Sequence, residues 1–285
     1  MLKETKIILL LALLVGLIYV FPHIIYSFQE GPYNPLYISP GRAFLDESIY
    51  AAGVQEVLEG NFVPTDLGTL EHKPGPFIYG PFPFIVMALL TFCGGIVGAI
   101  ILSDFLFAAF GFLLFYLLAK KLLASHQLAL ISSLIFTFWY RLFIPPSTFS
   151  PSGLLHHFIS ALWNGSGTSV HFWFSRFLHP QIPLVLMLGT VYALYLALEQ
   201  HKWRYYSLTA LLLALNFYSY LYNWTYLLVL SGLLMLCTLL QRKKDWFLKL
   251  TFTLLVSLLL AVPYILNALA LHTLDITARS GIEYG

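Results

Sequence analysis

Eight long apolar stretches constrain the fold of this chain more than any other feature of its sequence. They cover roughly residues 7–27, 77–93, 95–118, 127–144, 181–199, 206–222, 224–240 and 247–270. A run of 18 or more apolar residues is typical of a helix that crosses a bilayer. Charged residues make up 10% of the 285 residues, whereas a soluble domain has about 25%. The sequence therefore predicts an all-α polytopic membrane protein, with residues 1–285 forming a single membrane domain.

The basic residues between these stretches predict how the chain crosses the membrane. Short cytoplasmic loops are rich in lysine and arginine. Ten of the 15 basic residues fall in four clusters: Lys3 and Lys6; Lys120 and Lys121; Lys202 and Arg204; Arg242, Lys243, Lys244 and Lys249. If all four clusters face the cytoplasm, residues 77–118 cross the membrane once in total. The prediction is a plasma-membrane protein with seven crossings and a cytoplasmic N-terminus, whose first helix stays uncleaved or serves as a signal anchor.

The stretch 77–93 is the one that this topology excludes as a crossing. Gly80, Pro81 and Pro83 lie near its start, and proline inside a helix removes a hydrogen bond and clashes with the preceding turn. The regular part that remains is too short to span about 30 Å of hydrocarbon. We therefore expect a re-entrant or interfacial helix over 77–93, with 95–118 as the crossing.

Two long loops, 28–76 and 145–180, then lie outside the membrane. Seven of the 13 acidic residues fall in the first of them. Long loops carry function more often than short connectors do, so we expect the functional site on this extracytoplasmic side. The two cysteines, Cys93 and Cys237, both lie in apolar stretches and predict neither a disulfide framework nor a metal site.

Asp46 and Glu47 form a pair of adjacent acids in the first outer loop, and an amphipathic helix is predicted over 46–59 directly after them. Its apolar face would carry Tyr50, Val54, Val57 and Leu58, and Gly60-Asn61 would end it. Such a helix lies on the membrane surface. The pair has two interpretations: acids in a first turn cap a helix and complement its dipole, or a carboxylate kept ionised there acts as a base.

Cationic residues near the predicted bilayer surface are candidates for binding a phosphate. His72 and Lys73 precede the proline-rich entry to 77–93, and Arg176 and His179 end the second outer loop. An arginine among aromatic residues at a membrane boundary is costly unless it meets an anion. The alternatives are a solvated loop, snorkelling side chains or cation–π packing. The histidines have no zinc-binding spacing, and we expect no metal, cofactor or nucleic-acid partner.

Asp104 is a further candidate, because it lies within the apolar stretch 95–118. An acidic residue inside a membrane helix is expensive and usually functional. A tyrosine partner or a water-filled groove would also accommodate it.

Taken together, these elements resemble the GT-C superfamily of membrane glycosyltransferases, and above all the protein O-mannosyltransferase and aminoarabinose-transferase group. The resemblance lies in "LDESIYAAGVQEVLEGNF", with Asp46-Glu47 followed by Tyr50, and in "EHKPGPFIYGP", where a glycine separates the two prolines after Lys73. The second acidic motif of oligosaccharyltransferases is missing from loop 145–180, which favours metal-independent chemistry. The chain also lacks the further crossings and the soluble domain of the group, as a fragment or a minimal catalytic module would.

The resemblance implies transfer of a sugar from a polyprenyl-phosphate donor to a protein, lipid or glycan acceptor outside the membrane. Asp46 would act as the base, Glu47 would orient it or the acceptor, and Lys73 and Arg176, with His72 or His179, would bind the donor phosphate. Two alternatives remain open. One is a transporter or lipid flippase, and the other is a membrane subunit without catalytic activity.

Overall fold

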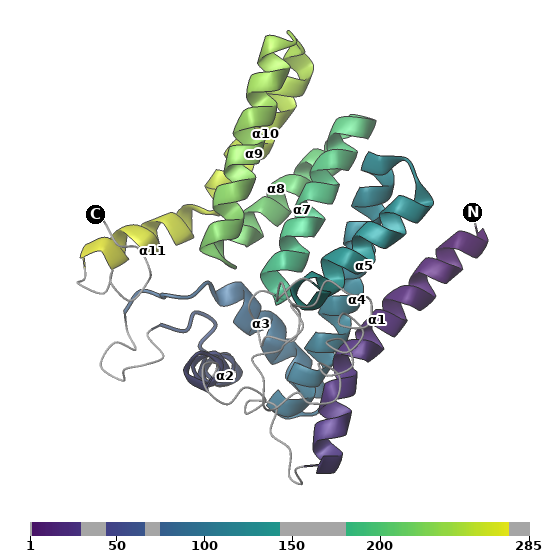
Figure 1. Cartoon of the computed structure of the whole chain (residues 1–285). Coiled ribbons are helices and arrows are strands. Elements are labelled where there is room, and N and C mark those ends of the chain that lie inside the picture. The colour runs from purple at the N-terminus through teal and green to yellow at the C-terminus, as the bar shows by residue number, and fades with distance from the viewer. Residues whose placement is uncertain (1, 30–43, 66–74, 143–180, 274–285) are drawn as a thin grey trace. The chain divides into compact units, whose positions relative to one another are not determined.

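The computed structural model describes residues 2–29, 44–65, 75–142 and 181–273 (Figure 1). Every regular element in these residues is helical, so the all-α class is confirmed for the described part of the chain. The helices are α1 (Leu2–Gln29), α2 (Phe44–Leu58), α3 (Pro81–Leu90), the 3-10 helix η3 (Thr91–Cys93), α4 (Gly95–Leu123), α5 (His126–Leu142), α7 (Gln181–Gln200), α8 (Trp203–Phe217), α9 (Leu221–Leu240), α10 (Lys244–Leu260) and α11 (Val262–Thr273).

Four of the described helices are long and apolar enough to cross a membrane: α1, α4, α7 and α9. A fifth crossing results if α10 and α11 form one bent span. The seven predicted crossings are not confirmed, because α5 has 17 residues and α8 only 15. At a rise of 1.5 Å per residue these two helices measure about 25 Å and 22 Å, short of the hydrocarbon thickness.

The apolar stretch 247–270 was predicted as a single crossing. In the structure it is bent. The structure divides it into α10 and α11, which meet at 54°. Pro263 explains the break, because it has no N–H to donate and its ring disfavours helical geometry at the preceding residue, Val262.

Very short turns join several consecutive helices at the ends where the basic clusters lie. Ala124 after α4, His201 after α7 and Arg242 after α9 all have positive φ, between 51° and 57°. A left-handed residue just past a helix end reverses the chain sharply. The structure therefore shows that the chain turns tightly beside the basic residues at 120–121, 202–204 and 242–244.

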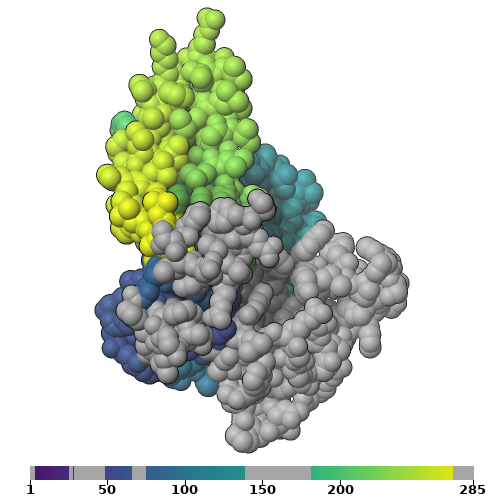
Figure 2. All heavy atoms as spheres, turned by 90° about the vertical axis from the view of Figure 1, so that its left-hand side faces the viewer, coloured from purple at the N-terminus to yellow at the C-terminus, as the bar shows by residue number. Residues whose placement is uncertain are grey.

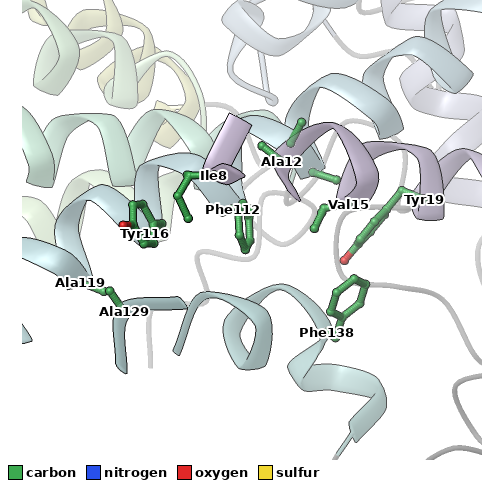
Figure 3. Close-up of a cluster of buried hydrophobic side chains, with 11 residues drawn as sticks. Ile8, Ala12, Val15, Tyr19, Phe112, Tyr116, Ala119, Ala129 and Phe138 are labelled. Carbon is green, nitrogen blue, oxygen red and sulfur yellow. The ribbon is translucent and has the colours of Figure 1, made fainter. Parts of the chain in front are cut away.

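The described chain divides into two compact units, residues 1–55 with 86–185 and residues 56–85 with 186–285, here called unit 1 and unit 2. The core of unit 1 is formed by α1, α4 and α5 (Figure 3). Its largest buried side chains include Tyr19 and Phe112. The hydroxyl of Tyr19 donates to the carbonyl of Thr137 at 2.6 Å, and its ring stacks on Phe138, as Figure 3 shows for the labelled pair. These contacts fix α1 against α5.

Small residues let the helices of unit 1 approach closely. A Cβ on Gly16 of α1 would come within 2.8 Å of the carbonyl oxygen of Phe105 and 2.7 Å of its ring. Ala12 on α1 and Ala108 and Ala109 on α4 are also buried in this core. Small residues at such interfaces are typical of helices packed in a membrane.

In unit 2, the segment that leads into α3 is attached to other helices through its backbone. The side-chain amide of Asn267, on α11, donates to the carbonyl of Phe77 at 2.8 Å and accepts from the Phe77 N–H at 2.9 Å. The Phe82 N–H donates to the carbonyl of Tyr218 at 3.0 Å. A Cβ on Gly80 would lie 2.4 Å from that same carbonyl oxygen, so only glycine fits there without displacing the backbone.

Aromatic side chains fill the space around these hydrogen bonds. Tyr264 on α11 contacts the rings of Phe77, Phe217, Tyr218 and Trp224 at centroid distances of 5.9–6.1 Å. Pairs at such distances add stabilisation beyond the area that they bury. Unit 2 therefore joins the entry to α3, the turn between α8 and α9, and the bend between α10 and α11 through aromatic packing and backbone hydrogen bonds.

Helices α9, α10 and α11 of unit 2, whose atoms are light green to yellow in Figure 2, carry many exposed apolar side chains. Leu233 and Leu240 on α9, Leu255 and Leu259 on α10 and Leu266 on α11 are each more than half exposed. Soluble monomers rarely expose contiguous apolar patches of this kind. The surface fits contact with lipid and supports the assignment of the chain to the membrane.

Candidate functional site

The acidic pair at the start of the first outer loop lies at the beginning of a helix, as the sequence predicted. Helix α2 begins at Phe44, so Asp46 and Glu47 belong to its first turn and Tyr50 lies one turn further on. An acid in the first turn of a helix is stabilised in its ionised form by the exposed N–H groups there. The helix start therefore suits either interpretation of the pair.

The apolar face predicted for this helix is confirmed at three of its four positions. Tyr50, Val54 and Val57 are buried, whereas Leu58 is 44% exposed. Leu58 differs because the helix ends there and the chain turns away at Gly60, which has a φ of 97°.

The end of α2 follows a common capping pattern. The N–H of Gly60 donates to the carbonyl of Val57, and the N–H of Asn61 donates to the carbonyl of Glu56. The Asn61 side chain also donates to the Glu56 carboxylate at 2.9 Å. The predicted stop at Gly60-Asn61 is therefore confirmed, and the tail of α2 is fixed by local hydrogen bonds.

Four of the predicted site residues lie outside the described residues. They are His72, Lys73, Arg176 and His179. Their role in binding a phosphate stays a prediction. The structure describes the backbone of Asp46 and Glu47, and their roles also stay predictions.

Asp104 occupies a polar cluster inside unit 1. A hydrogen bond of 2.7 Å joins its Oδ2 to Nε2 of His23 on α1, and its Oδ1 accepts a hydrogen bond from the side-chain amide of Gln181, the first residue of α7. Asp104 and Gln181 are fully buried, and His23 is 3% exposed. A carboxylate in such surroundings is tolerated only with partners on its oxygens. We call His23, Asp104 and Gln181 the Asp104 cluster.

The three residues of the cluster lie at similar distances along their helices from one helix end. Nineteen residues separate Asp104 from Leu123 at the end of α4, and nineteen separate Gln181 from Gln200 at the end of α7. Twenty-one separate His23 from Leu2 at the start of α1. These spacings correspond to about 28–32 Å, which is the thickness of the hydrocarbon core. Each of the three helices has basic residues at or next to one end. His23, Asp104 and Gln181 each lie about one membrane thickness along the helix from that end.

An ion pair at the opposite end of α1 and α4 supports this placement. Nζ of Lys120 lies 3.9 Å from the carboxylate of Glu4, and both side chains are about half exposed. The two helices are therefore antiparallel, with the exposed pair at one end and the buried Asp104 cluster toward the other. The contrast in exposure agrees with a water-facing end and a membrane-embedded cluster.

His23 and Gln181 are site candidates that sequence reasoning missed. His23 follows a proline within the first apolar stretch, and Gln181 follows Pro180 at the start of another. Counting one membrane thickness from the basic end of each helix would have placed both beside Asp104. The partner expected for Asp104 was a tyrosine or water, and the structure provides a histidine and an amide instead.

Comparisons with known proteins give no further guide to the site, since no family model, no curated protein and no solved structure matches the chain. In residues 2–29, 44–65, 75–142 and 181–273, no three His, Cys, Asp or Glu side chains come together as metal ligands would.

Proposed function

We propose that the chain is an integral membrane glycosyltransferase of the GT-C kind, which transfers a sugar from a polyprenyl-phosphate donor to an acceptor hydroxyl outside the membrane. The observation that carries the proposal is the acidic pair Asp46-Glu47 in the first turn of α2, a helix in the loop after the first spanning helix. The Lys73-Pro74 element and the short helix α3, which follow it along the chain, add support.

The proposed reaction needs one base and a cationic pocket. Asp46 removes the proton from the acceptor hydroxyl as that oxygen forms a bond to the anomeric carbon of the sugar. The bond between this carbon and the phosphate oxygen breaks, and the phosphate leaves with the electron pair. Lys73 and Arg176, with His72 or His179, offset the charge on the departing phosphate. Glu47 orients Asp46 or the acceptor.

The proposal retains seven crossings, with α5 and α8 each crossing in addition to the longer helices. Spanning helices of 17 residues are at the short end of those that cross a bilayer, and α5 has that length. Helix α8 has 15 residues, so its crossing requires the residues that flank it to lie within the hydrocarbon region as well. It also retains a cytoplasmic N-terminus, since the Lys3 and Lys6 end of α1 would face the cytoplasm. The acidic pair and the proposed phosphate-binding residues then lie on the extracytoplasmic side.

Donor consumption by the purified protein tests the proposal. The full chain in lipid nanodiscs is incubated with polyprenyl-phosphate hexose or pentose, each radiolabelled in the sugar, and with a membrane extract as the source of acceptor. We expect time-dependent release of polyprenyl phosphate and appearance of label in an acceptor. A donor that stays intact with both sugars and with every acceptor fraction would overturn the proposal.

A transporter is the second candidate function, because the Asp104 cluster places a buried carboxylate and histidine within membrane-spanning helices. Groups of this kind mark proton or ion pathways in transporters. Against this candidate, transporter sites lie near the bilayer midplane, whereas the cluster lies about one membrane thickness along each helix from its basic end. Proton-coupled or sodium-coupled uptake by sealed proteoliposomes, lost in Asp104→Asn, would favour the transporter.

A further inference from the structure

The Asp104 cluster involves the helix ends that flank the two segments that carry the proposed catalytic and phosphate-binding residues. His23 is six residues before Gln29, the last residue of α1, after which the chain leads to Asp46 and Lys73. Gln181 is the first residue of α7, directly after the segment that contains Arg176 and His179. One carboxylate on α4 therefore bonds to a residue just before the first outer loop and to a residue just after the second.

We propose that Asp104 is a positioning residue for the transfer reaction: it fixes the end of α1 and the start of α7 relative to α4, and these two helix ends are where the segments that carry the proposed site residues join the membrane helices. This inference rests on the proposed function. Asp104 itself has no contact with substrate in the proposal.

The chemistry of the cluster suits such a role better than apolar packing would. Each oxygen of the Asp104 carboxylate is hydrogen-bonded to a side chain of a different helix, so the carboxylate links α4 to both α1 and α7. Polar pairs buried at low dielectric are strong when satisfied and costly when broken, which leaves a single arrangement of the three side chains. Apolar side chains of similar volume would hold the helices together without selecting one register.

A neighbouring residue provides a matched control. Ser103 is also fully buried on α4, but its hydroxyl donates to the carbonyl of Ile100 within the same helix, at 2.8 Å. Ser103→Ala therefore removes a buried polar group next to Asp104 without affecting a bond between helices. This variant shows the effect of losing a buried polar side chain of α4 while the hydrogen bonds of Asp104 to α1 and α7 stay in place.

Kinetics of sugar transfer by the full chain in nanodiscs tests the inference. We compare Asp104→Ala, Asp104→Asn and Ser103→Ala with the unmodified chain, measuring kcat and the KM for the donor. We expect kcat to fall about 10- to 100-fold in Asp104→Ala, because a misplacement of about 1 Å has effects of that size. Asp104→Asn, whose amide oxygen still accepts from Gln181, should fall less, and Ser103→Ala should keep both constants. The donor KM should change less than kcat in each Asp104 variant.

Hydrogen exchange on the same samples gives a readout that needs no activity. In Asp104→Ala, amides in residues 24–29 and 182–186 should exchange faster, while those in residues 116–126 at the opposite ends of α4 and α5 should not change. If Asp104→Ala does not fold, Asp104→Asn, which keeps the volume of the side chain and the acceptor for Gln181, should speed exchange in residues 24–29 alone.

The outcomes separate the inference from the proposed function. If the unmodified chain transfers sugar and Asp104→Ala keeps its kcat, or if Ser103→Ala loses as much, the positioning role is wrong. If the unmodified chain transfers no sugar, the proposed function fails, and the exchange data alone decide whether Asp104 fixes the two helix ends. Unchanged exchange at 24–29 and 182–186 would overturn the inference.

Discussion

The two units of the chain hold distant segments together by different means. In unit 1, three buried polar side chains from α1, α4 and α7 meet at Asp104. In unit 2, the segment before α3 is held through its own backbone, by Asn267 at Phe77 and by the Tyr218 carbonyl at Phe82. The Asp104 cluster of unit 1 therefore depends on hydrogen bonds between side chains, whereas the entry to α3 in unit 2 depends on the shape of a backbone. Substitutions that remove a charge should affect the first, and substitutions that add volume should affect the second.

The largest effect on stability should come from removing His23. In His23→Leu, Asp104 stays buried without its histidine partner, and removing one partner of a buried pair of ionisable groups costs about 3–5 kcal/mol. The double variant His23→Leu/Asp104→Leu should recover part of that loss, because no buried carboxylate remains. Reversible unfolding in mixed micelles measures both free energies of unfolding. A double variant no more stable than His23→Leu would contradict this account of the cluster.

Removal of the Asn267 side chain should have the next largest effect. Asn267→Ala leaves the N–H and the carbonyl of the buried Phe77 backbone without that partner, at a cost of about 1–3 kcal/mol for each group left unsatisfied. Asn267→Asp is the sharper variant, because its carboxylate still accepts from the Phe77 N–H but cannot donate to the carbonyl. Its loss should be at least as large as that of Asn267→Ala, because a carboxylate oxygen replaces the donor and faces the Phe77 carbonyl. A smaller loss in the same unfolding measurement would contradict the donation to that carbonyl.

A methyl group at Gly80 should destabilise unit 2 by about 1–3 kcal/mol, the usual cost of overpacking. The new Cβ would overlap the carbonyl of Tyr218, which is backbone and cannot rotate away. Gly232→Ala on α9 is the matched control, since nothing lies within 4 Å of its added Cβ. That control should be neutral or more stable by up to about 1 kcal/mol, the difference in helix propensity. Thermal unfolding of the two variants measures the difference, and equal stabilities would refute the close approach at Gly80.

The smallest effect should come from the exposed ion pair at the other end of α1 and α4. Lys120→Gln removes the contact with Glu4 and should change the free energy of unfolding by less than about 1 kcal/mol, because solvent screens exposed pairs. A loss as large as that of His23→Leu would mean that exposure does not distinguish the two ends of these helices.

The sequence predicted much of the fold but not the contacts between helices. Apolar stretches located the long helices, and Gly60-Asn61 marked the end of α2 correctly, because local backbone preferences decide both. The bend between α10 and α11 within the stretch 247–270 was not predicted although Pro263 lies there, since an average over an apolar window does not weigh a single missing N–H. The His23 and Gln181 partners of Asp104 were missed because they are 81 and 77 residues away in the chain. The roles of Lys73 and Arg176 depend on distances that no local pattern encodes.

The measurement that tests the central claim most directly is the rate of sugar transfer by Asp46→Asn, compared with the unmodified chain and with Glu47→Gln. The account predicts that Asp46→Asn keeps its KM for the polyprenyl-phosphate donor but loses at least about 100-fold in kcat, because the amide cannot accept the proton of the acceptor hydroxyl. Glu47→Gln should lose less. Full transfer activity in Asp46→Asn would show that the acidic pair only begins a helix, and that the chemistry lies elsewhere.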